Sequence, residues 1–569
     1  MRYLALATDY DGTLAVHGRV PPEAIAALKR LRLSGRRAIL VTGRRLEDLM
    51  SVCPELDLFD CVVAENGGLV YSPRTREQTL LGKPPPPEFV ERLRSLGVDP
   101  LDLGHVILGT CLPHHTAVVQ AIQELGLELL VIFNGAAVMV LPPGVNKATG
   151  LDYALRRLGL SFHEAVGIGN AENDHSFLDR CECSAAVADA VSSLRRRTSF
   201  VTAGEAGQGV VELIDELVAD DLLKTRGKLQ QHYVPLGLRA DGSEIMISPY
   251  GTNILIAGPS GSGKSTVTAG ILERLMEQSY QICIVDPEGD YGSLQKVLTL
   301  GHHRHAVTVP EALAILEDPK INLNINLLGI RLADRPEFFG ELFPSLRSLR
   351  TRTGRPHWLV LDEAHHMLSV EWGHLPDVLP RKIGETILVT VHPGHLPSAI
   401  LTLMDVVIAV GPSPKATLDE VCEAAGYSLR WPEGLDFKAG KAVAWFPRRE
   451  TPPLSMGILR AGGERIRHHR KYAEGDMRDH SFVFCGPEAR HKIRAQNLSI
   501  FSVIAEGIEE ETWLFHLYRG DYTRWFRDSV KDPYLADQTE RIEQRRNLSP
   551  QETRELLIDL IEARYTLPE

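Results

Sequence analysis

The stretch NILIAGPSGSGKST, residues 253–266, constrains the fold of this chain more than any other segment. An apolar run that suits a buried strand leads into a loop rich in glycine and serine, and a helical pattern follows. Backbone N–H groups of such a loop, together with the N-terminus of the next helix, bind phosphate groups. Because the loop follows the carboxyl end of a buried strand, the segment predicts an α/β domain with a parallel sheet.

The loop fits the pattern G-x-x-x-x-G-K-[ST] through Gly258, Gly263, Lys264 and Ser265. Lys264 is expected to reach the β- and γ-phosphates of ATP, and Ser265 to hold Mg²⁺. The expected nucleotide-binding set is completed by three further loop residues, Ser260, Gly261 and Thr266.

A second apolar run, within HWLVLDEAHHML at residues 357–368, ends in two acidic residues. Asp362 is expected to hold Mg²⁺ through water, and Glu363 to polarise the water that attacks the nucleotide. The run ETILVTVHP ends with Thr390 and His392, which are candidate sensors of the γ-phosphate. With the glycine-rich loop, these residues predict ATP hydrolysis rather than binding alone.

The N-terminal stretch DYDGTL places Asp9 and Asp11 two residues apart after a strand-like run. Alternate side chains of an extended segment point the same way, so these carboxylates can share a Mg²⁺. One can attack phosphorus while the other protonates the leaving oxygen. Thr42, after the next strand-like run, can bind a phosphoryl oxygen, and Lys147 can neutralise the developing charge.

The stretch GIGNAENDHSFL would complete this first site with Asp174 and, beside it, Asn173. A metal site of this kind favours a carboxylate directly after the second glycine, where the chain has Asn170. An amide oxygen can bind Mg²⁺, but it brings no charge. The sequence therefore leaves two readings open, a weakened phosphatase and a domain that only senses a phosphorylated ligand.

DYDGTL, VTGRR, AENGGLVY, GVNKATGL and GNAEND, in this order, resemble the haloacid dehalogenase superfamily, with the Cof-like and sugar-phosphatase branch nearest. The resemblance covers residues 1–215 and implies a Rossmann-like core with an α/β cap inserted at about 85–145. It implies that Asp9 is the nucleophile, that Asp11 is the general acid/base and that Thr42 and Lys147 bind phosphate. The implied Mg²⁺ ligands are Asp9, Asp11, Asn170 and Asp174.

CIVDPEGDYGSL, followed by LDEAHH, resembles HerA-like and conjugation-type ATPases over residues 246–450. The resemblance implies a RecA/HerA-like P-loop core with an additional strand, often assembled as a hexamer. A neighbouring subunit would then supply an arginine, for which Arg331 and Arg335 are candidates. The DEAH letters do not indicate a superfamily-two helicase, because no arginine-bearing final motif and no second RecA-like core follow.

A chain of 569 residues is too long for one core and indicates three or four domains. Residues 216–245 are expected to be a linker, and 465–569 a mainly helical domain rich in aromatic residues. The net charge of −12 makes nucleic acid a less favoured partner. Eight cysteines without C-x-x-C spacing, and no apolar run of roughly 18 residues, indicate a cytoplasmic protein without a membrane span.

Together these patterns predict a cytoplasmic hydrolase with two activities. A phosphatase domain for a small phosphorylated metabolite is fused to an ATPase domain, and the chain is expected to form a homo-oligomer. The alternatives are an ATPase regulated by a phosphate-sensing first domain, and a HerA-like translocase of nucleic acid.

Overall fold

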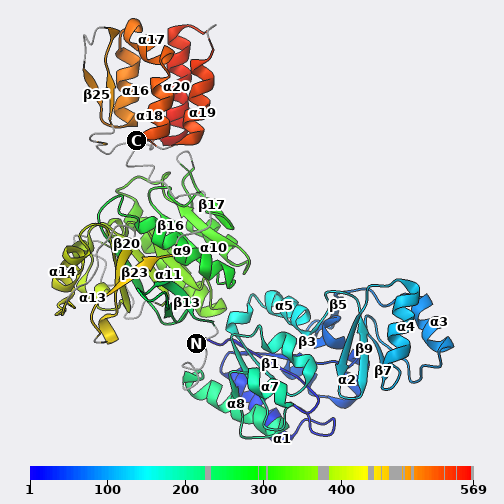
Figure 1. Ribbon diagram of the computed structural model, residues 1–569. Helices are drawn as coiled ribbons and strands as arrows, with labels where there is room; N and C mark the ends of the chain where they lie inside the picture. Colours follow the sequence, from blue (N-terminus) through cyan, green and yellow to red (C-terminus); the bar gives the residue numbers. More distant parts are fainter. Residues whose placement is uncertain are drawn as a thin grey trace. The chain divides into compact units, whose positions relative to one another are not determined.

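The computed structural model describes residues 1–569 except 224–231, 293, 303–304, 369–383, 433–440, 450, 460–476, 478–480, 488–491, 531, 546–547 and 566–569. The chain forms two compact units (Figure 1). The first contains Met1–Tyr233 and the short later segments Glu317–Lys320 and Arg347–His357. The second contains Val234–Leu316, Ile321–Leu346 and Trp358–Glu569.

The first unit is built on an eight-stranded sheet with the order β12-β11-β10-β1-β2-β3-β4-β5. The strands from β12 to β3 run parallel, and the edge strands β4 and β5 are antiparallel. Their bounds are β1 Ala5–Thr8, β2 Arg37–Val41, β3 Cys61–Ala64, β4 Leu69–Ser72, β5 Glu77–Leu80, β10 Ala165–Gly169, β11 Cys183–Ala186 and β12 Phe200–Val201.

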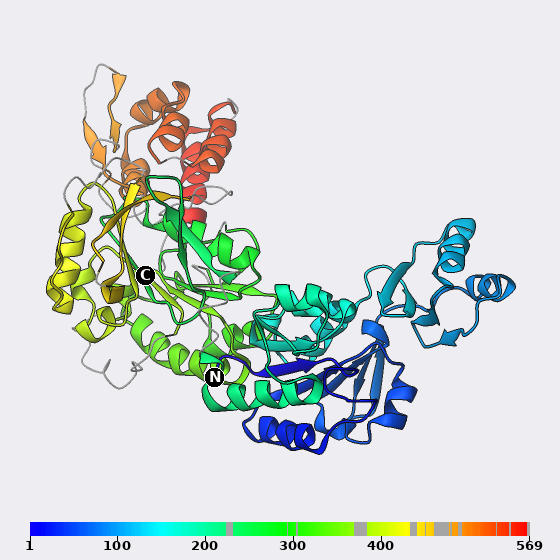
Figure 2. The ribbon, with the colours of Figure 1, turned by 60° about the horizontal axis from the view of Figure 1, so that its bottom comes forward.

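Helices cover this sheet because the parallel strands are apolar on both faces; β1, β3, β10 and β11 are buried along their whole length. Helices α1 and α8 lie side by side (Figure 2). The helices are α1 Pro22–Leu33, α2 Leu46–Val52, α5 Lys147–Arg157, α6 His175–Leu178, α7 Ser192–Arg197 and α8 Ala206–Asp220. The predicted Rossmann-like core is confirmed.

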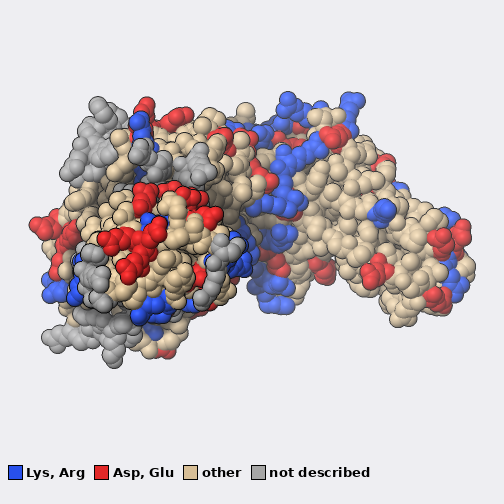
Figure 3. Space-filling model, turned by 90° about the horizontal axis from the view of Figure 1, so that it is seen from above, with Lys and Arg blue, Asp and Glu red and all other residues tan. Residues whose placement is uncertain are grey.

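A small α/β cap is inserted between β5 and α5. Its four-stranded antiparallel sheet has the order β6-β7-β9-β8 and packs with two helices around a small apolar core. Its elements are α3 Pro87–Ser95, β6 Asp102–Leu103, β7 Leu108–Cys111, α4 His115–Leu125, β8 Leu130–Asn134 and β9 Ala137–Leu141. On the face in Figure 3, the cap at the right end carries acidic and basic side chains near one another.

Segments from later in the sequence complete the first unit. Arg355 and His357 are almost fully buried there, with 0% and 3% of their surface exposed. The Arg355 guanidinium donates to the carbonyl oxygen of Gly159 at 2.6 Å, and His357 Nε2 lies 2.6 Å from Glu164 Oε1. Burial opposes the charge of Glu164, but the nearby His357 lowers the pKa of this carboxyl. These segments are therefore part of the first unit's interior.

The second unit contains an eleven-stranded sheet with the order β14-β13-β23-β22-β21-β15-β20-β19-β16-β18-β17. The seven strands from β21 to β17 are parallel, and the remaining four pair antiparallel. The strands are β13 Val234–Leu238, β14 Glu244–Ile247, β15 Ile254–Ala257, β16 Ile282–Asp286, β17 Val297–Leu300, β18 Asn322–Asn326, β19 Trp358–Leu361, β20 Thr386–Thr390, β21 Val406–Val410, β22 Lys441–Trp445 and β23 Leu454–Ile458.

Strand β20 lies between β15, which precedes the glycine-rich loop, and β19, which precedes Asp362. This is the additional strand that the resemblance implies. The helices of this part are α9 Lys264–Glu277, α10 Val309–Leu316, α11 Arg335–Thr353, α13 Ser398–Leu401 and α14 Pro414–Ala425.

The expected linker at 216–245 is wrong as a description of the fold. Helix α8 continues to Asp220, and β13 and β14 join the second sheet as its edge. Val234, Leu236 and Ile245 are buried in that core, so the alternation of apolar residues was a strand signal inside a polar stretch.

The C-terminal part is mainly helical, as predicted, and also contains a two-stranded antiparallel hairpin. Many of its aromatic residues are buried in a packed core around Phe501, Trp513 and Tyr522, whereas Tyr518 and Tyr534 are exposed. The elements are β24 Phe482–Phe484, β25 Ile493–Ala495, α16 Leu498–Gly507, α17 Glu510–Tyr518, α18 Asp521–Asp528, α19 Pro533–Glu543 and α20 Pro550–Tyr565. The expected start of this domain, residue 465, lies outside the described residues.

Among the described residues, none of the helices combines the length and the apolar character needed to cross a bilayer.

Candidate functional sites

Lys147 joins two acidic strand ends in the first unit. Strands β1 and β10 are neighbours, so Asp9 and Asp174 emerge at the same edge of the sheet. Lys147 begins α5 and its Nζ donates to Asp9 Oδ1 and Asp174 Oδ1, each at 2.6 Å. Burial and the charge of Asp174 raise the pKa of Asp9, while Lys147 opposes the rise. One buried cation thus serves two buried carboxylates.

Asn170 lies beside the turn of DYDGTL. Its Oδ1 accepts a hydrogen bond from Thr13 Oγ1 at 3.1 Å. Gly12 has a φ of +71°, and a Cβ there would lie 2.3 Å from Asn170 Nδ2. Glycine is therefore required by both the backbone conformation and the close approach of this amide.

Asp11 is held by an arginine that the sequence reasoning did not use. Arg44 Nε and Nη2 donate to the two carboxylate oxygens of Asp11, each at 2.7 Å. The backbone N–H of Arg44 also donates to Thr42 Oγ1 at 3.1 Å, which places Thr42 in the same group. A bidentate pair of this kind fixes the orientation of the carboxylate.

The side-chain oxygens of this site can be tested against Mg²⁺. Asp11 and Asp174 have both carboxylate oxygens engaged by protein donors. Asp9 has a second carboxylate oxygen besides the one that meets Lys147, and Asn170 Oδ1 has a further lone pair. Both are hard oxygen ligands of the type that Mg²⁺ binds. By chemical type, the oxygens of Asp9 and Asn170 therefore suit Mg²⁺, and Asp9 is the acidic one of the two.

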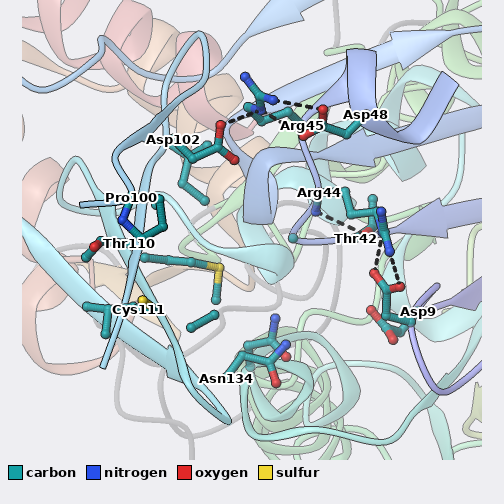
Figure 4. A pocket seen from close by; sticks show the side chains of 18 residues that line it. Asp9, Thr42, Arg44, Arg45, Asp48, Pro100, Asp102, Thr110, Cys111 and Asn134 are labelled. Atoms are coloured by element: carbon teal, nitrogen blue, oxygen red, sulfur yellow. Dashed lines mark hydrogen bonds and ion pairs between the residues drawn. The ribbon is translucent and has the colours of Figure 1, made fainter. Parts of the chain in front are cut away.

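A pocket of about 370 Å³ lies between these residues and the cap (Figure 4). The core lines it with Asp9, Asp11, Thr42, Gly43, Arg44, Arg45, Asp48 and Asn173. The cap lines it with Pro100, Asp102, Ile107, Gly109, Thr110, Cys111, Asn134, Ala137, Val138 and Met139. Its volume falls within the roughly 300–1,000 Å³ of small-molecule sites. The arrangement can therefore enclose a small phosphorylated compound over Asp9.

Two core residues hold the cap at this pocket. The Arg45 guanidinium lies 2.8 Å from Asp48 of the core and 3.1 Å from Asp102 of the cap (Figure 4). Glu65 is fully buried, and its carboxylate accepts backbone N–H groups of the cap segment 105–107 at 2.7–3.1 Å. Sequence reasoning missed Arg44, Arg45 and Glu65, although VTGRR and AENGGLVY place them at strand ends, where functional side chains gather.

The glycine-rich loop of the second unit follows β15 as predicted. Gly258 has a φ of +153°, and a Cβ there would lie 2.0 Å from the carbonyl oxygen of Val410. Lys264 begins α9 and is 2% exposed, and its Nζ donates to the Pro259 carbonyl oxygen at 3.3 Å. Burial lowers the pKa of Lys264, although Glu363 and Asp362 oppose this. In the same segment, Ser260 and Gly261 are exposed, Gly263 and Thr266 are half-buried and Ser265 is buried.

Asp362 and Glu363 follow β19 and are both buried. Burial and the charge of Glu363 raise the pKa of Asp362. Glu363 has a φ of +42°, a strained conformation for a residue other than glycine. His365 Nδ1 lies 3.4 Å from Glu363 Oε2 and 3.1 Å from Thr390 Oγ1. The structure thus brings the acidic pair together with Thr390.

His392, the other sensor candidate, also lies in this group, with its ring centroid 5.3 Å from that of His365. Burial and the neighbouring histidines lower the pKa of His365 to about 3, so its imidazole is neutral at physiological pH.

The two arginine candidates differ in exposure. Arg335 is 3% exposed and donates to the carbonyl oxygens of Ile330 and Leu327. The Arg331 side chain is 70% exposed and pairs with Asp334 at 2.8 Å. Arg335 therefore supports its own loop, and Arg331 is the exposed one of the two candidates.

Comparison with known proteins identifies two families. Residues 6–96 and 131–214 match the haloacid dehalogenase-like hydrolase family, and residues 244–366 match the central domain of helicase HerA. A solved haloacid dehalogenase-like hydrolase from Bacteroides thetaiotaomicron has a TM-score of 0.34 and 19% identity, over 38% of this chain and 100% of that chain.

Curated relatives match the first unit over nearly their whole length. The phosphoglycolate phosphatase of Methanothermobacter thermautotrophicus is 30% identical over 218 residues, 37% of this chain and 96% of that protein. The phosphoglycolate phosphatase of Haloarcula marismortui is 32% identical over 219 residues, 37% of this chain and 95% of that protein. The chain therefore belongs to the haloacid dehalogenase-like hydrolase family and joins to that phosphatase domain a HerA-like domain.

Proposed function

We propose that the first unit is a Mg²⁺-dependent phosphomonoesterase that acts on a small phosphorylated metabolite through an aspartyl-phosphate. The observation that supports this most directly is Asp9, which lines the pocket under the cap and is oriented by Lys147. The names of the curated relatives make phosphoglycolate the first substrate to test.

In the first step, a carboxylate oxygen of Asp9 attacks phosphorus and the bond to the leaving oxygen breaks. Asp11 must first take up a proton, for which one hydrogen bond from Arg44 is released, and it then gives this proton to the leaving oxygen. In the second step, Asp11 takes a proton from water, which attacks phosphorus and frees Asp9 and phosphate. Lys147 and Thr42 hold the phosphoryl group, and Mg²⁺, when bound by Asp9 and Asn170, offsets its negative charge.

Replacement of the nucleophile tests this function. The full-length Asp9→Asn protein should lose phosphate release from phosphomonoesters by at least about 10³-fold, because an amide is a poor nucleophile. A panel of phosphoglycolate, sugar phosphates and nucleotides, with Mg²⁺, provides the measurement. Equal release by the wild type and Asp9→Asn would assign any activity to another group.

A second prediction concerns Asn170. Asn170→Asp restores a charged ligand and should raise phosphate release about 10-fold at limiting Mg²⁺, since changes around a metal typically alter affinity about 10–100-fold. The gain should shrink as Mg²⁺ approaches saturation. Mg²⁺ titration of both proteins measures this. If both remain inactive at high Mg²⁺ on the whole panel, the phosphate-sensing alternative replaces the enzymatic one.

We further propose that the second unit binds and hydrolyses ATP. The support is the placement of Lys264 at the start of α9 and of Asp362 and Glu363 after β19, two strands from the loop-bearing β15. Assembly into a homo-oligomer, with Arg331 near a neighbouring nucleotide, and a cytoplasmic location belong to the same proposal. DNA-stimulated, salt-sensitive ATPase activity would favour the translocase alternative.

A further inference from the structure

The pocket under the cap has an excess of negative groups. Its lining includes four carboxylates and two guanidinium groups: Asp9, Asp11, Asp48, Asp102, Arg44 and Arg45. Both arginines are already in ion pairs. A phosphate group has Lys147 nearby, but a second anionic group on the substrate finds both lining arginines occupied.

Arg45 is the lining arginine that contacts the cap, and its surroundings decide what it can bind. It donates to both oxygens of Asp48 at 2.8 Å, lies 3.1 Å from Asp102 and donates to the carbonyl oxygen of Leu103 at 3.2 Å. A guanidinium and two carboxylates together carry a net negative charge, so this group does not attract a third carboxylate. Within the described residues, the cap itself contributes neither lysine nor arginine to this pocket.

The cap does offer neutral polar groups. Cys111 and Asn134 line the pocket, and both are half-buried. The side-chain amide of Asn134 can donate and accept hydrogen bonds, so it can meet a hydroxyl group on a substrate tail. A volume of about 370 Å³ also leaves room for more than a two-carbon tail.

We propose, on the basis of the phosphatase function above, that the site takes phosphomonoesters with an uncharged, hydroxylated tail, and that Asp102 excludes substrates with a carboxylate there. Asp102 acts in two ways: it forms an ion pair with Arg45, and it places its own negative charge at the cap side of the pocket. Asn134 is a contact for the tail hydroxyl. The chain would then differ from the phosphoglycolate phosphatases that it resembles in the substrate it prefers.

Matched substrate pairs test this. Phosphoglycolate ends in a carboxylate, and 2-hydroxyethyl phosphate has a hydroxymethyl group in its place. 3-Phosphoglycerate and glycerol 1-phosphate form a second pair with the same difference. In each pair, full-length wild-type protein should show a kcat/KM roughly tenfold higher for the neutral member, because like charges a few Å apart repel strongly near a protein surface.

Asp102→Asn keeps the shape of the side chain and removes its charge. This variant should raise kcat/KM for the carboxylate members, so that kcat/KM for the neutral member exceeds that for the carboxylate member by no more than about threefold. Asn134→Ala should lower kcat/KM for the neutral members roughly fivefold, since it removes a hydrogen-bonding group. Glu124→Gln is the control, because Glu124 pairs with Arg92 elsewhere in the cap, and its ratio should equal that of the wild type.

A wild type that prefers the carboxylate members, or a ratio unaffected by Asp102→Asn, would overturn the inference and leave the phosphatase function intact. If wild type and Asp9→Asn release no phosphate from any of the four compounds, the phosphatase function fails instead. Calorimetric binding of the same compounds to the full-length protein then decides the inference. The inference is supported if the wild type binds the neutral members more tightly and Asp102→Asn abolishes this preference. Equal binding of the two members of a pair, or no binding, overturns the inference.

Discussion

Lys264→Ala should abolish ATP hydrolysis, with a loss of at least about 10²–10³-fold, while phosphomonoester hydrolysis by the same chain continues. The large effect is expected because Lys264 is the cation at the start of α9 that would meet the β- and γ-phosphates. The protein should still fold, since Lys264 is 2% exposed and burial already disfavours its charge. ATP turnover and phosphate release from a monoester, measured on one preparation, check both halves.

Glu363→Gln is the informative comparison, because it removes only the carboxylate that we expect to polarise the attacking water. It should retain ATP binding and lose turnover, whereas Lys264→Ala should weaken both. Wild-type ATP hydrolysis in Lys264→Ala would show that the glycine-rich loop is not the nucleotide site. Loss of the monoesterase in Lys264→Ala would show that the two activities depend on each other, although their residues lie on separate sheets.

The second large effect is expected for Lys147→Met, which retains much of the volume of the side chain without its charge. Two buried carboxylates, Asp9 and Asp174, would lose the cation that lies 2.6 Å from each. Breaking a buried pair typically costs about 3–5 kcal/mol, so the first unit should unfold at a distinctly lower temperature. Phosphate release should fall to background, because Lys147 is also the residue that we propose to hold the phosphoryl group.

Calorimetric melting and phosphate release, both on full-length protein, measure these two effects. Lys29→Met on α1 is a suitable control, since Lys29 is exposed and its replacement should change neither quantity. Unchanged melting together with unchanged turnover in Lys147→Met would contradict the role assigned to this lysine.

Both α/β cores could be predicted from the sequence because their strands are buried on both faces and end in polar motifs. Short apolar runs such as Ala5–Thr8 and Ile254–Ala257 stand out against Gly-rich loops. The strands β13 and β14 could not be predicted, because the polar residues around them resemble a linker. In addition, β23, with which β13 pairs, lies more than two hundred residues away in the chain.

The site was predictable only where residues act at fixed spacing along the chain. Asp9, Asp11 and Lys147 belong to local motifs, and the structure places them near one another. The contact of Arg45 with Asp102 was not predictable, because Asp102 belongs to the cap and the number of residues between the two matches no sequence motif. Such pairs depend on how a loop is folded over a distant strand end.

The burial of Arg355 and His357 in the first unit has a consequence for how modular this fusion is. A gene fragment that ended at Tyr233 would include every residue assigned to phosphoryl transfer, but it would leave Glu164 without His357 and the Gly159 carbonyl without Arg355. The two halves therefore cannot be exchanged as independent pieces at the point that sequence order suggests. A lineage that lost the second half would have to replace these contacts to keep the first.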